Sequence, residues 1–386
     1  MVYRESRRFK LAILSFLGQF SIAMANFALV YLLRAKGFDS FEIGIAASIN
    51  PLFYLISCFA FQIILKERKA KIETIASMLG MAISLFFVMV FQSKAMIYTM
   101  LCLYGCANSL LWSNVESWIT GKEEGPSLGS SVALFNLSWS LGAGISTFVG
   151  GLLSAVSVDL PIIVVVAIFA ALAFFIVFIE NPDSNGGPES SIEKDSSTNL
   201  RFYCWTAVVL LYIGYSLIVT IFPLYALDKL ALSEEKTGFL LLSRGLSACI
   251  SFVILGRFSF WQFNKAFIFS MQLALIFLVA LLAIVHSNVA IAFVLVLFGF
   301  VFASIYELSI FHGASGAIDR NKRMIVHEVL LTLGTMIGSL LGGYLYKYFS
   351  FQMIIVALAL PSLAIWIVEI ALFVMSTKLN NGILEV

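Results

Sequence analysis

Arg244 is the ionisable residue whose position most needs a functional explanation. It lies inside an apolar stretch, 237–256. Charged side chains within long apolar segments are costly to bury and usually serve a function. The planar guanidinium presents paired donors that match a carboxylate or a phosphate. Arg244 is therefore a candidate anion-binding residue; the alternative is a permanent pair with a glutamate that holds two helices together.

Two glutamates lie in other apolar stretches. Glu116 stands within the sequence WSNVESW and Glu307 within SIYELSIF. Carboxyl groups in apolar surroundings are suited to binding and releasing protons. We predict that both exchange protons or bind substrate, although a glutamate at a membrane interface that only touches water is the competing interpretation.

Three further titratable residues lie near one another in the sequence. Glu328 follows His327 at the start of an apolar stretch, and His312 closes the preceding one. Glu328 is a candidate for proton or substrate binding, or an ordinary partner of a helix dipole. No metal-ligand spacing, nucleotide-binding loop or catalytic motif is present. We expect no metal, no cofactor and no conventional catalytic site.

Uncharged polar and aromatic residues inside the apolar stretches complete the set of candidate binding residues. Gln19 and Asn26 are seven residues apart, so they share one face of a helix. The other members of this set are Asn50, Asn108, Trp112, Tyr212 and Tyr215. Rings with polar groups suit an organic ligand of mixed character, and helix packing is the alternative role for each residue.

The composition defines the elements that must position these residues. Of 386 residues, 61% are hydrophobic and only 12% are charged, so lipid must cover much of the surface. The formal charge of +2 suggests no nucleic-acid partner. Runs long enough to cross a bilayer as helices lie near 9–33, 41–65, 72–92, 95–119, 126–156, 159–179, 203–227, 237–256, 266–285, 289–311, 324–346 and 351–375.

A polar segment near the middle of the chain divides these twelve predicted spans into two blocks of six. Residues 180–200 are rich in Gly and Ser and lack apolar periodicity, which is typical of a linker. We predict an N-terminal bundle over 1–180, a linker over 181–201 and a C-terminal bundle over 202–386. Seventeen Lys and Arg residues lie in loops on the side of the termini and six in the opposite loops, which predicts cytoplasmic termini.

The two blocks resemble each other. The stretch from Tyr31 to Gly44 and the stretch from Tyr225 to Gly238 both run from Tyr to Gly, 194 residues apart. LGAGISTFVGG, starting at Leu141, resembles LGTMIGSLLGG, starting at Leu333, at an offset of 192. Two matches in the same order indicate an internal duplication. The offset of 194 aligns Asn50 with Arg244, and Gly105 with Gly299.

A polar stripe follows this duplication through spans five and eleven. Spacings of four and seven place its members on one helix face: Asn136, Ser140 and Thr147 in span five, and Glu328, Thr332 and Ser339 in span eleven. A cavity wall and a packing seam between helices remain equal alternatives for this stripe.

These features together resemble the major facilitator superfamily. Twelve spans, six-plus-six repeats and a middle linker match the family over nearly the whole chain. The glycines of span five here resemble the glycine-rich motif that the family has in the same span. Glycines spaced in this way also leave a flat helix face for close packing. They are Gly142, Gly150 and Gly151 in span five, and Gly334, Gly338, Gly342 and Gly343 in span eleven. The loop LKERKAK lacks the family's Gly and Asp, which indicates a divergent member.

The resemblance implies an all-α membrane fold of two pseudo-symmetric bundles that rock about a central site. It also implies that spans one, four, seven and ten face the cavity, and that the protein is a monomer in the plasma membrane. We therefore expect a secondary transporter for a small organic solute, coupled to protons, with organic-anion transport and drug or metabolite efflux both open. A membrane enzyme acting on lipids and a non-transporting sensor are the alternatives from other classes.

Overall fold

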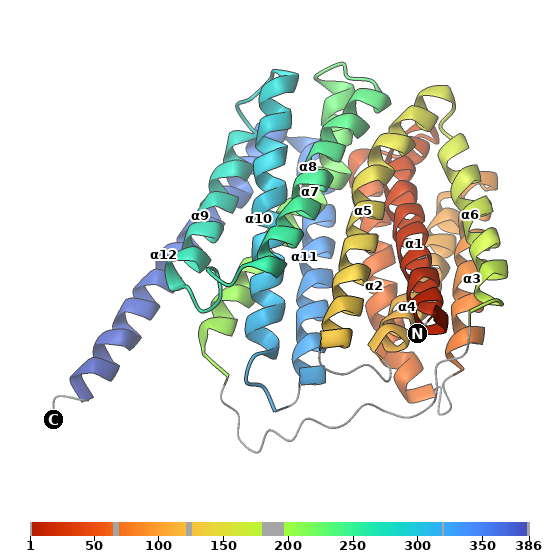
Figure 1. The fold of residues 1–386 in the computed structure, drawn as a ribbon. Coiled ribbons are helices and arrows are strands. Elements are labelled where there is room, and N and C mark those ends of the chain that lie inside the picture. The colour runs from red at the N-terminus through yellow and green to blue at the C-terminus, as the bar shows by residue number, and fades with distance from the viewer. Residues whose placement is uncertain (1, 65–68, 121–125, 180–196, 319, 384–386) are drawn as a thin grey trace.

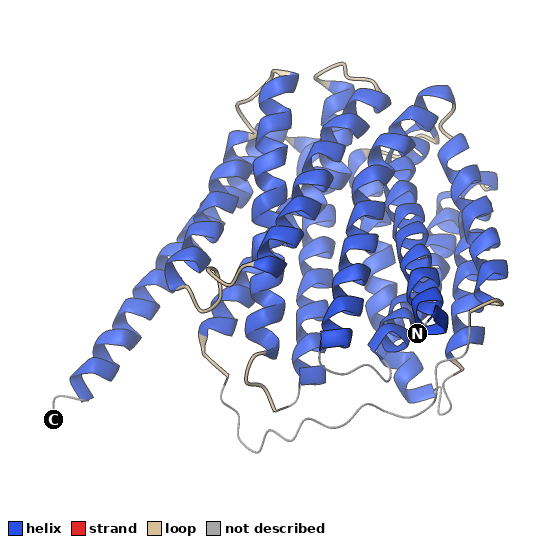
Figure 2. Ribbon diagram, viewed as in Figure 1, coloured by secondary structure: helices blue, strands red, loops and turns tan. Residues whose placement is uncertain are grey.

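The protein folds as a bundle of long helices. The structure, a computed structural model, describes residues 2–64, 69–120, 126–179, 197–318 and 320–383. Its first six helices are α1 (Val2–Ala35), α2 (Ser40–Ile64), α3 (Ala70–Val90), α4 (Lys94–Thr120), α5 (Pro126–Val156) and α6 (Leu160–Ile176). The next six are α7 (Leu200–Asp228), α8 (Glu234–Arg257), α9 (Lys265–Leu281), α10 (Asn288–Ala314), α11 (Arg320–Tyr348) and α12 (Phe351–Ile383). No strand occurs among these residues (Figure 2).

Apolar composition and helix length explain why these segments suit a bilayer. Ten of the described helices are long and apolar enough to cross it, and α6 and α9 are shorter apolar helices of 17 residues each. A helix pairs its own backbone groups, which lipid cannot do. Ser233, Asn264 and Ser287 cap α8, α9 and α10 by accepting backbone N–H groups. The twelve-helix fold predicted from the sequence is confirmed.

The helices alternate in direction, so the N-terminal end of α1 and the C-terminal end of α12 lie at the same face of the bundle (Figure 1). We name this the terminal face and the other the opposite face. The loops α1–α2, α7–α8 and α11–α12 lie at the opposite face. Helices α3, α6, α9 and α12 pack on the outside, where α3 contacts α4 and α6, and α9 contacts α10 and α12.

Two helix pairs form the most extensive contacts between the first six helices and the last six. Helix α5 packs along α8, and α2 packs along α11. Near the opposite face both pairs meet through glycines. A Cβ on Gly44 of α2 would lie 2.5 Å from the carbonyl oxygen of Ser339 on α11. A Cβ on Gly238 of α8 would collide with the carbonyl oxygen of Thr147 on α5. The contacts are repeat equivalents, which is the arrangement that an internal duplication produces.

The glycine stripes of α5 and α11 make the same set of contacts in each half. In α5, Gly142 and Gly150 face α1, and Gly151 faces α8. In α11, the corresponding contacts are those of Gly334, Gly338 and Gly342 with α7, and of Gly343 with α2. Each stripe therefore contacts a cavity-lining helix of its own half through most of its glycines. Its last glycine contacts a helix of the other half.

Candidate functional site

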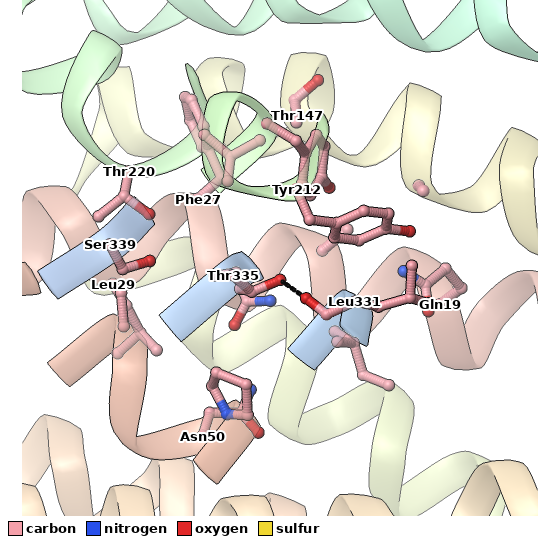
Figure 3. Close-up of a pocket in the computed structure, with 18 of the residues that line it drawn as sticks. Gln19, Phe27, Leu29, Asn50, Thr147, Tyr212, Thr220, Leu331, Thr335 and Ser339 are labelled. Carbon is pink, nitrogen blue, oxygen red and sulfur yellow. Dashed lines mark hydrogen bonds between the residues drawn. The ribbon is translucent and has the colours of Figure 1, made fainter. Parts of the chain in front are cut away.

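A cavity of about 330 Å³ lies between the two halves. Helices α1, α2, α4 and α5 line it from one half, and α7, α8, α10 and α11 from the other. None of the described residues of the peripheral helices α3, α6, α9 and α12 contributes to the lining. Figure 3 shows polar side chains such as Gln19, Asn50 and Thr335 around this space. Because residues of both halves line this cavity, it is the candidate binding site.

Nine of the twelve predicted binding residues line this cavity. They are Gln19, Asn26, Asn50, Asn108, Trp112, Tyr212, Tyr215, Arg244 and Glu328. The polar stripe also faces the cavity, through Ser140, Thr147, Glu328, Thr332 and Ser339. Between the two roles left open for the stripe, the structure favours the cavity wall, although Thr147 and Ser339 also contact the other half.

The remaining three predicted residues do not contribute to the described lining. Asn136 instead accepts a hydrogen bond from Trp139 Nε1 at 3.3 Å, and Trp139 itself lines the cavity. Glu116 lies on α4, but its side chain is outside the part of the structure that is described. Glu307 is half-buried on α10 and is absent from the lining.

Helix geometry explains the position of Glu307. Phe302 is the residue of α10 that lines the cavity. Residues five apart are rotated by about 140° around a helix, so Glu307 projects from a different face. Tyr306, four residues after Phe302, does stay on the same side and contacts Trp139 and His327. The sequence of α10 predicts a carboxyl group inside the span but does not fix the helix face on which it lies.

Arg244 is buried in the cavity wall, with 4% of its surface exposed. Its guanidinium carbon lies 4.8 Å from the ring centroid of Tyr215 and 5.8 Å from that of Phe302. Among the described residues no carboxylate forms an ion pair with it, and its Nε atom is buried without a hydrogen-bond partner. Aromatic rings stabilise a cation only in part, so Arg244 carries a positive charge that an anion in the cavity would neutralise.

Asn50 and Asn108 lie on the wall formed by the first half. Their side-chain Oδ1 atoms are buried, and neither has a hydrogen-bond partner among the described residues. Asn108 is 8% exposed. Buried amide groups without partners are costly. Their position on the cavity wall indicates that a ligand or water supplies the missing hydrogen bonds.

The backbones around Arg244 and Asn50 are built alike. A Cβ on Gly105 of α4 would lie 2.6 Å from the carbonyl oxygen of Asn50 on α2. A Cβ on Gly299 of α10 would collide with the carbonyl oxygen of Arg244 on α8. The sequence offset of 194 relates both members of each contact. The α2–α4 and α8–α10 crossings are therefore equivalent.

Aromatic residues close part of the cavity wall between the halves. The ring of Trp139 on α5 lies 6.1 Å from that of Phe252 on α8 and 6.0 Å from that of Tyr306 on α10. The residues predicted from the sequence did not include Trp139, Phe252 or Phe302, which also line the cavity. The offset of 194 that relates Asn108 to Phe302 would have identified the last of these.

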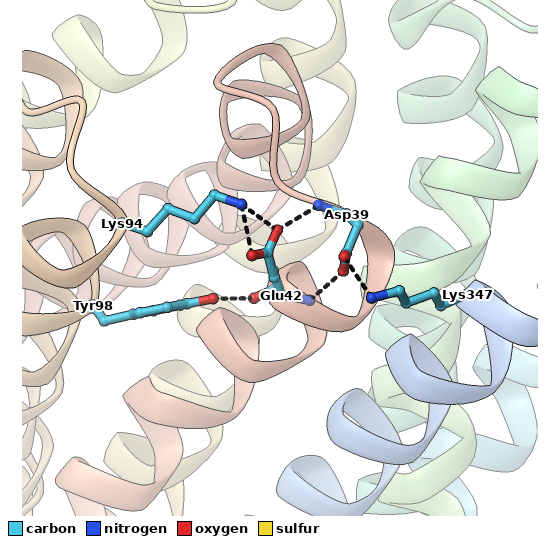
Figure 4. Close-up of polar contacts among 5 residues, drawn as sticks. All are labelled: Asp39, Glu42, Lys94, Tyr98 and Lys347. Atoms are coloured by element: carbon cyan, nitrogen blue, oxygen red, sulfur yellow. Dashed lines mark hydrogen bonds and ion pairs between the residues drawn. The ribbon is translucent and has the colours of Figure 1, made fainter.

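Ion pairs connect the halves at the opposite face. Arg34 Nη2 of α1 lies 3.2 Å from Asp228 Oδ1 of α7. Lys347 Nζ of α11 lies 2.8 Å from Asp39 Oδ2, just before α2 (Figure 4). Partial burial raises the pKa of Asp39, but hydrogen bonds from Lys347 and from backbone N–H groups outweigh this and lower it overall. These two pairs and the glycine junctions hold this end of the molecule together.

Comparisons with known proteins agree with this architecture. The family model of the Major Facilitator Superfamily matches residues 11–317. The crystal structure of the nucleoside transporter NupG is similar with a TM-score of 0.75 and 15% identity, covering 95% of this chain and 99% of that one. A bacterial homologue of the human lysosomal transporter Spinster, inward-facing and occupied, has a TM-score of 0.69 and 10% identity, covering 90% of this chain and 82% of that one.

No curated protein matches the chain. The two solved structures share less than 25% sequence identity with this chain, so their similarity shows a common fold. The family model matches most of the chain, so it shows family membership. The family is one of transporters and not of enzymes. With its twelve apolar helices in two repeated halves around a shared cavity, this multi-pass membrane protein belongs to the Major Facilitator Superfamily.

Proposed function

We propose that this protein is a secondary transporter that carries a small organic anion across the membrane by alternating access. The observation that carries the proposal is the charge of Arg244, which lies in the wall of the central cavity without an ion-pair partner among the described residues. A permanent structural pair, the alternative for Arg244, would need a carboxylate at its guanidinium. An anionic cargo provides that carboxylate during transport.

Alternating access requires contacts between the halves that form and break. The Arg34–Asp228 and Asp39–Lys347 pairs join the halves at the opposite face. Pairs near the surface are weak, of the order of 0–1 kcal/mol each, so they can separate when the halves rock. The excess of positive loop residues supports cytoplasmic termini in the plasma membrane, which would make the structure described here closed to the outside.

A proton gradient would supply the energy for this transport. Glu328 lies in the cavity wall with Arg244, so a proton on its carboxyl group would change the charge that the cargo meets. Glu307 and Glu116 remain candidates for proton exchange on α10 and α4. Influx of protons down their gradient would then drive movement of the anion.

Binding and transport can be tested in sequence. A thermal-shift screen of organic carboxylates and their neutral analogues on purified wild type and Arg244→Ala should give ligands that stabilise only the wild type. The best ligand is then tested for uptake into proteoliposomes with and without a pH gradient. Ligands that stabilise both proteins equally would contradict the proposed binding site at Arg244. An uptake rate that is the same with and without the pH gradient would contradict proton coupling.

A further inference from the structure

We propose that the cavity binds its cargo at two chemically different ends, and that the cargo is a ring-bearing monocarboxylate with a hydroxyl group at the other end. This inference rests on the proposed function, because it names the class of anion. Arg244 in the second half would bind the carboxylate, and Asn50 with Asn108 in the first half would bind the hydroxyl. The bound molecule would thus bridge the two halves.

The wall of the first half offers neutral hydrogen-bonding groups. Asn108 lies one helical turn after Gly105, and Gly105 packs directly on the backbone of Asn50. The two amides therefore belong to one helix crossing. Neither Oδ1 atom has a partner among the described residues, although both are buried at the cavity. A hydroxyl both donates and accepts, so it satisfies either end of an amide.

The wall of the second half offers the opposite chemistry at the equivalent place. Arg244 stands where the repeat has Asn50, and Phe302 stands where it has Asn108. The guanidinium lies over the rings of Tyr215 and Phe302. Its fork of donors matches a carboxylate in two parallel hydrogen bonds. A symmetric ligand would leave one of these walls unsatisfied.

Cavity size and lining restrict the cargo further. A volume of about 330 Å³ is at the small end of ligand pockets, which fits a single ring with short substituents. The cavity is also lined by the rings of Trp112, Trp139, Tyr212 and Tyr215, and such rings favour a flat apolar body. When it is ionised, Glu328 in the same lining would repel a second anionic group, which favours a monoanion.

The test compares two matched pairs of probes on the purified full-length protein by isothermal titration calorimetry. The pairs are 4-hydroxybenzoate with benzoate, and 3-(4-hydroxyphenyl)propionate with 3-phenylpropionate. In at least one pair the hydroxylated acid should bind wild type about tenfold more tightly, because only it pairs the buried amides. In Asn108→Leu and Asn50→Leu this preference should shrink toward equality, while binding of the unhydroxylated acid persists and shows that the variant is folded.

Matched controls separate the two ends. Asn288→Leu changes an exposed asparagine at the start of α10 and should keep the hydroxyl preference. Arg244→Gln should lose binding of all four acids, whereas Arg257→Gln, at an exposed end of the same helix, should keep it. The proposal is overturned if no probe binds wild type, or if the hydroxyl preference survives in both asparagine variants.

Failure of this proposal and failure of the proposed function give different results. If the two-ended binding pattern holds but the bound acid is never taken up by proteoliposomes, the transporter proposal is wrong and the two-ended site stands. If another anion is transported in an Arg244-dependent manner but hydroxylated acids show no preference, the two-ended site is wrong and the transporter proposal stands.

Discussion

The α2–α4 crossing of the first half and the α8–α10 crossing of the second half share one backbone design but present different chemistry. Gly105 packs on the backbone of Asn50, and Gly299 packs on the backbone of Arg244. At these crossings the first half presents two amides to the cavity. The second half presents a cation that lies over aromatic rings. Duplication preserved the contact between helices while the cavity surface diverged.

The difference has a physical cause. A side chain at either glycine would collide with a backbone carbonyl, and helix backbones move only at a large cost in packing. The side chains of Asn50 and Arg244 instead form part of the cavity wall. Substitution at these positions alters what the cavity binds without altering how the helices cross, so binding chemistry can change faster than the fold.

The strongest test of the comparison is removal of the charge from one wall. Arg244→Gln should weaken binding of the anionic cargo by about 100-fold or more, since loss of one partner of a buried charge pair costs about 2–5 kcal/mol. Asn50→Leu should weaken it only by about tenfold, because a neutral hydrogen bond contributes about 1 kcal/mol. Titration calorimetry with the best ligand gives both values.

Removal of the same charge should stabilise the protein without ligand, although it weakens binding of the anion. A buried charge without a partner destabilises the folded state, so Arg244→Met should raise the thermal unfolding temperature of the ligand-free protein in detergent. Asn50→Leu should raise it less. A lower unfolding temperature for Arg244→Met would mean that a group within the protein already neutralises the guanidinium, and the anion site would then lose its main argument.

Substitution of Gly105 and Gly299 tests whether the α2–α4 and α8–α10 crossings are equivalent. Gly105→Val and Gly299→Val should each destabilise the protein by about 1–3 kcal/mol, the usual cost of overpacking, and by similar amounts. Chemical or thermal unfolding of both variants gives the comparison. Gly256→Val, at a glycine of α8 with no neighbour within 4 Å of an added Cβ, is the control. A severe effect in one half only would show that the crossings are not equivalent.

The aromatic support of Arg244 has no equivalent in the first half, so its removal should affect one wall only. Tyr215→Leu removes a ring 4.8 Å from the guanidinium and should lower anion affinity severalfold, since such contacts contribute about 0.5–2 kcal/mol. Tyr215→Phe keeps the ring and should bind nearly as wild type. Equal losses in both variants would assign the effect to the hydroxyl group.

The fold was predictable because the signals that specify it are long and redundant. Each span needs about 20 apolar residues, and the duplicated stretches after Tyr31 and Tyr225 relate the two blocks. Boundaries were predicted within several residues of the observed helix ends. The division at 181–201 stays a prediction, since residues 180–196 lie outside the described part of the chain.

The cavity was predictable only where helix face and depth were both constrained. Arg244, Gln19 and Asn26 could be placed because polar side chains in a span avoid lipid. Glu307 satisfied the same rule yet lies off the cavity lining. Apolar side chains occur all around α10, so its sequence does not reveal which face turns inward. The proximity of Trp139 and Tyr306 depends on tertiary packing between halves, which local sequence does not report.

The smallest predicted effect concerns the opposite face, where the two halves are joined by charge. Asp39 and Glu42 cap α2 reciprocally: Glu42 N–H donates to Asp39 Oδ1, and Asp39 N–H donates to Glu42 Oε2 (Figure 4). Asn also caps helices, so Asp39→Asn removes the pair with Lys347 while keeping the cap. We expect a loss of about 1 kcal/mol or less at neutral pH.

The pH dependence of this loss identifies its cause. Because the pKa of Asp39 is lowered in the folded protein, its charge contributes stability above the pKa of an unfolded aspartate, and this contribution is lost as pH falls through the lower folded value. Thermal unfolding of wild type and Asp39→Asn should therefore differ at pH 7 and converge in acid. A Lys347→Met variant should behave in the same way as Asp39→Asn. A difference that stays constant down to acid pH would show that the loss does not come from the charge of the Asp39 carboxylate.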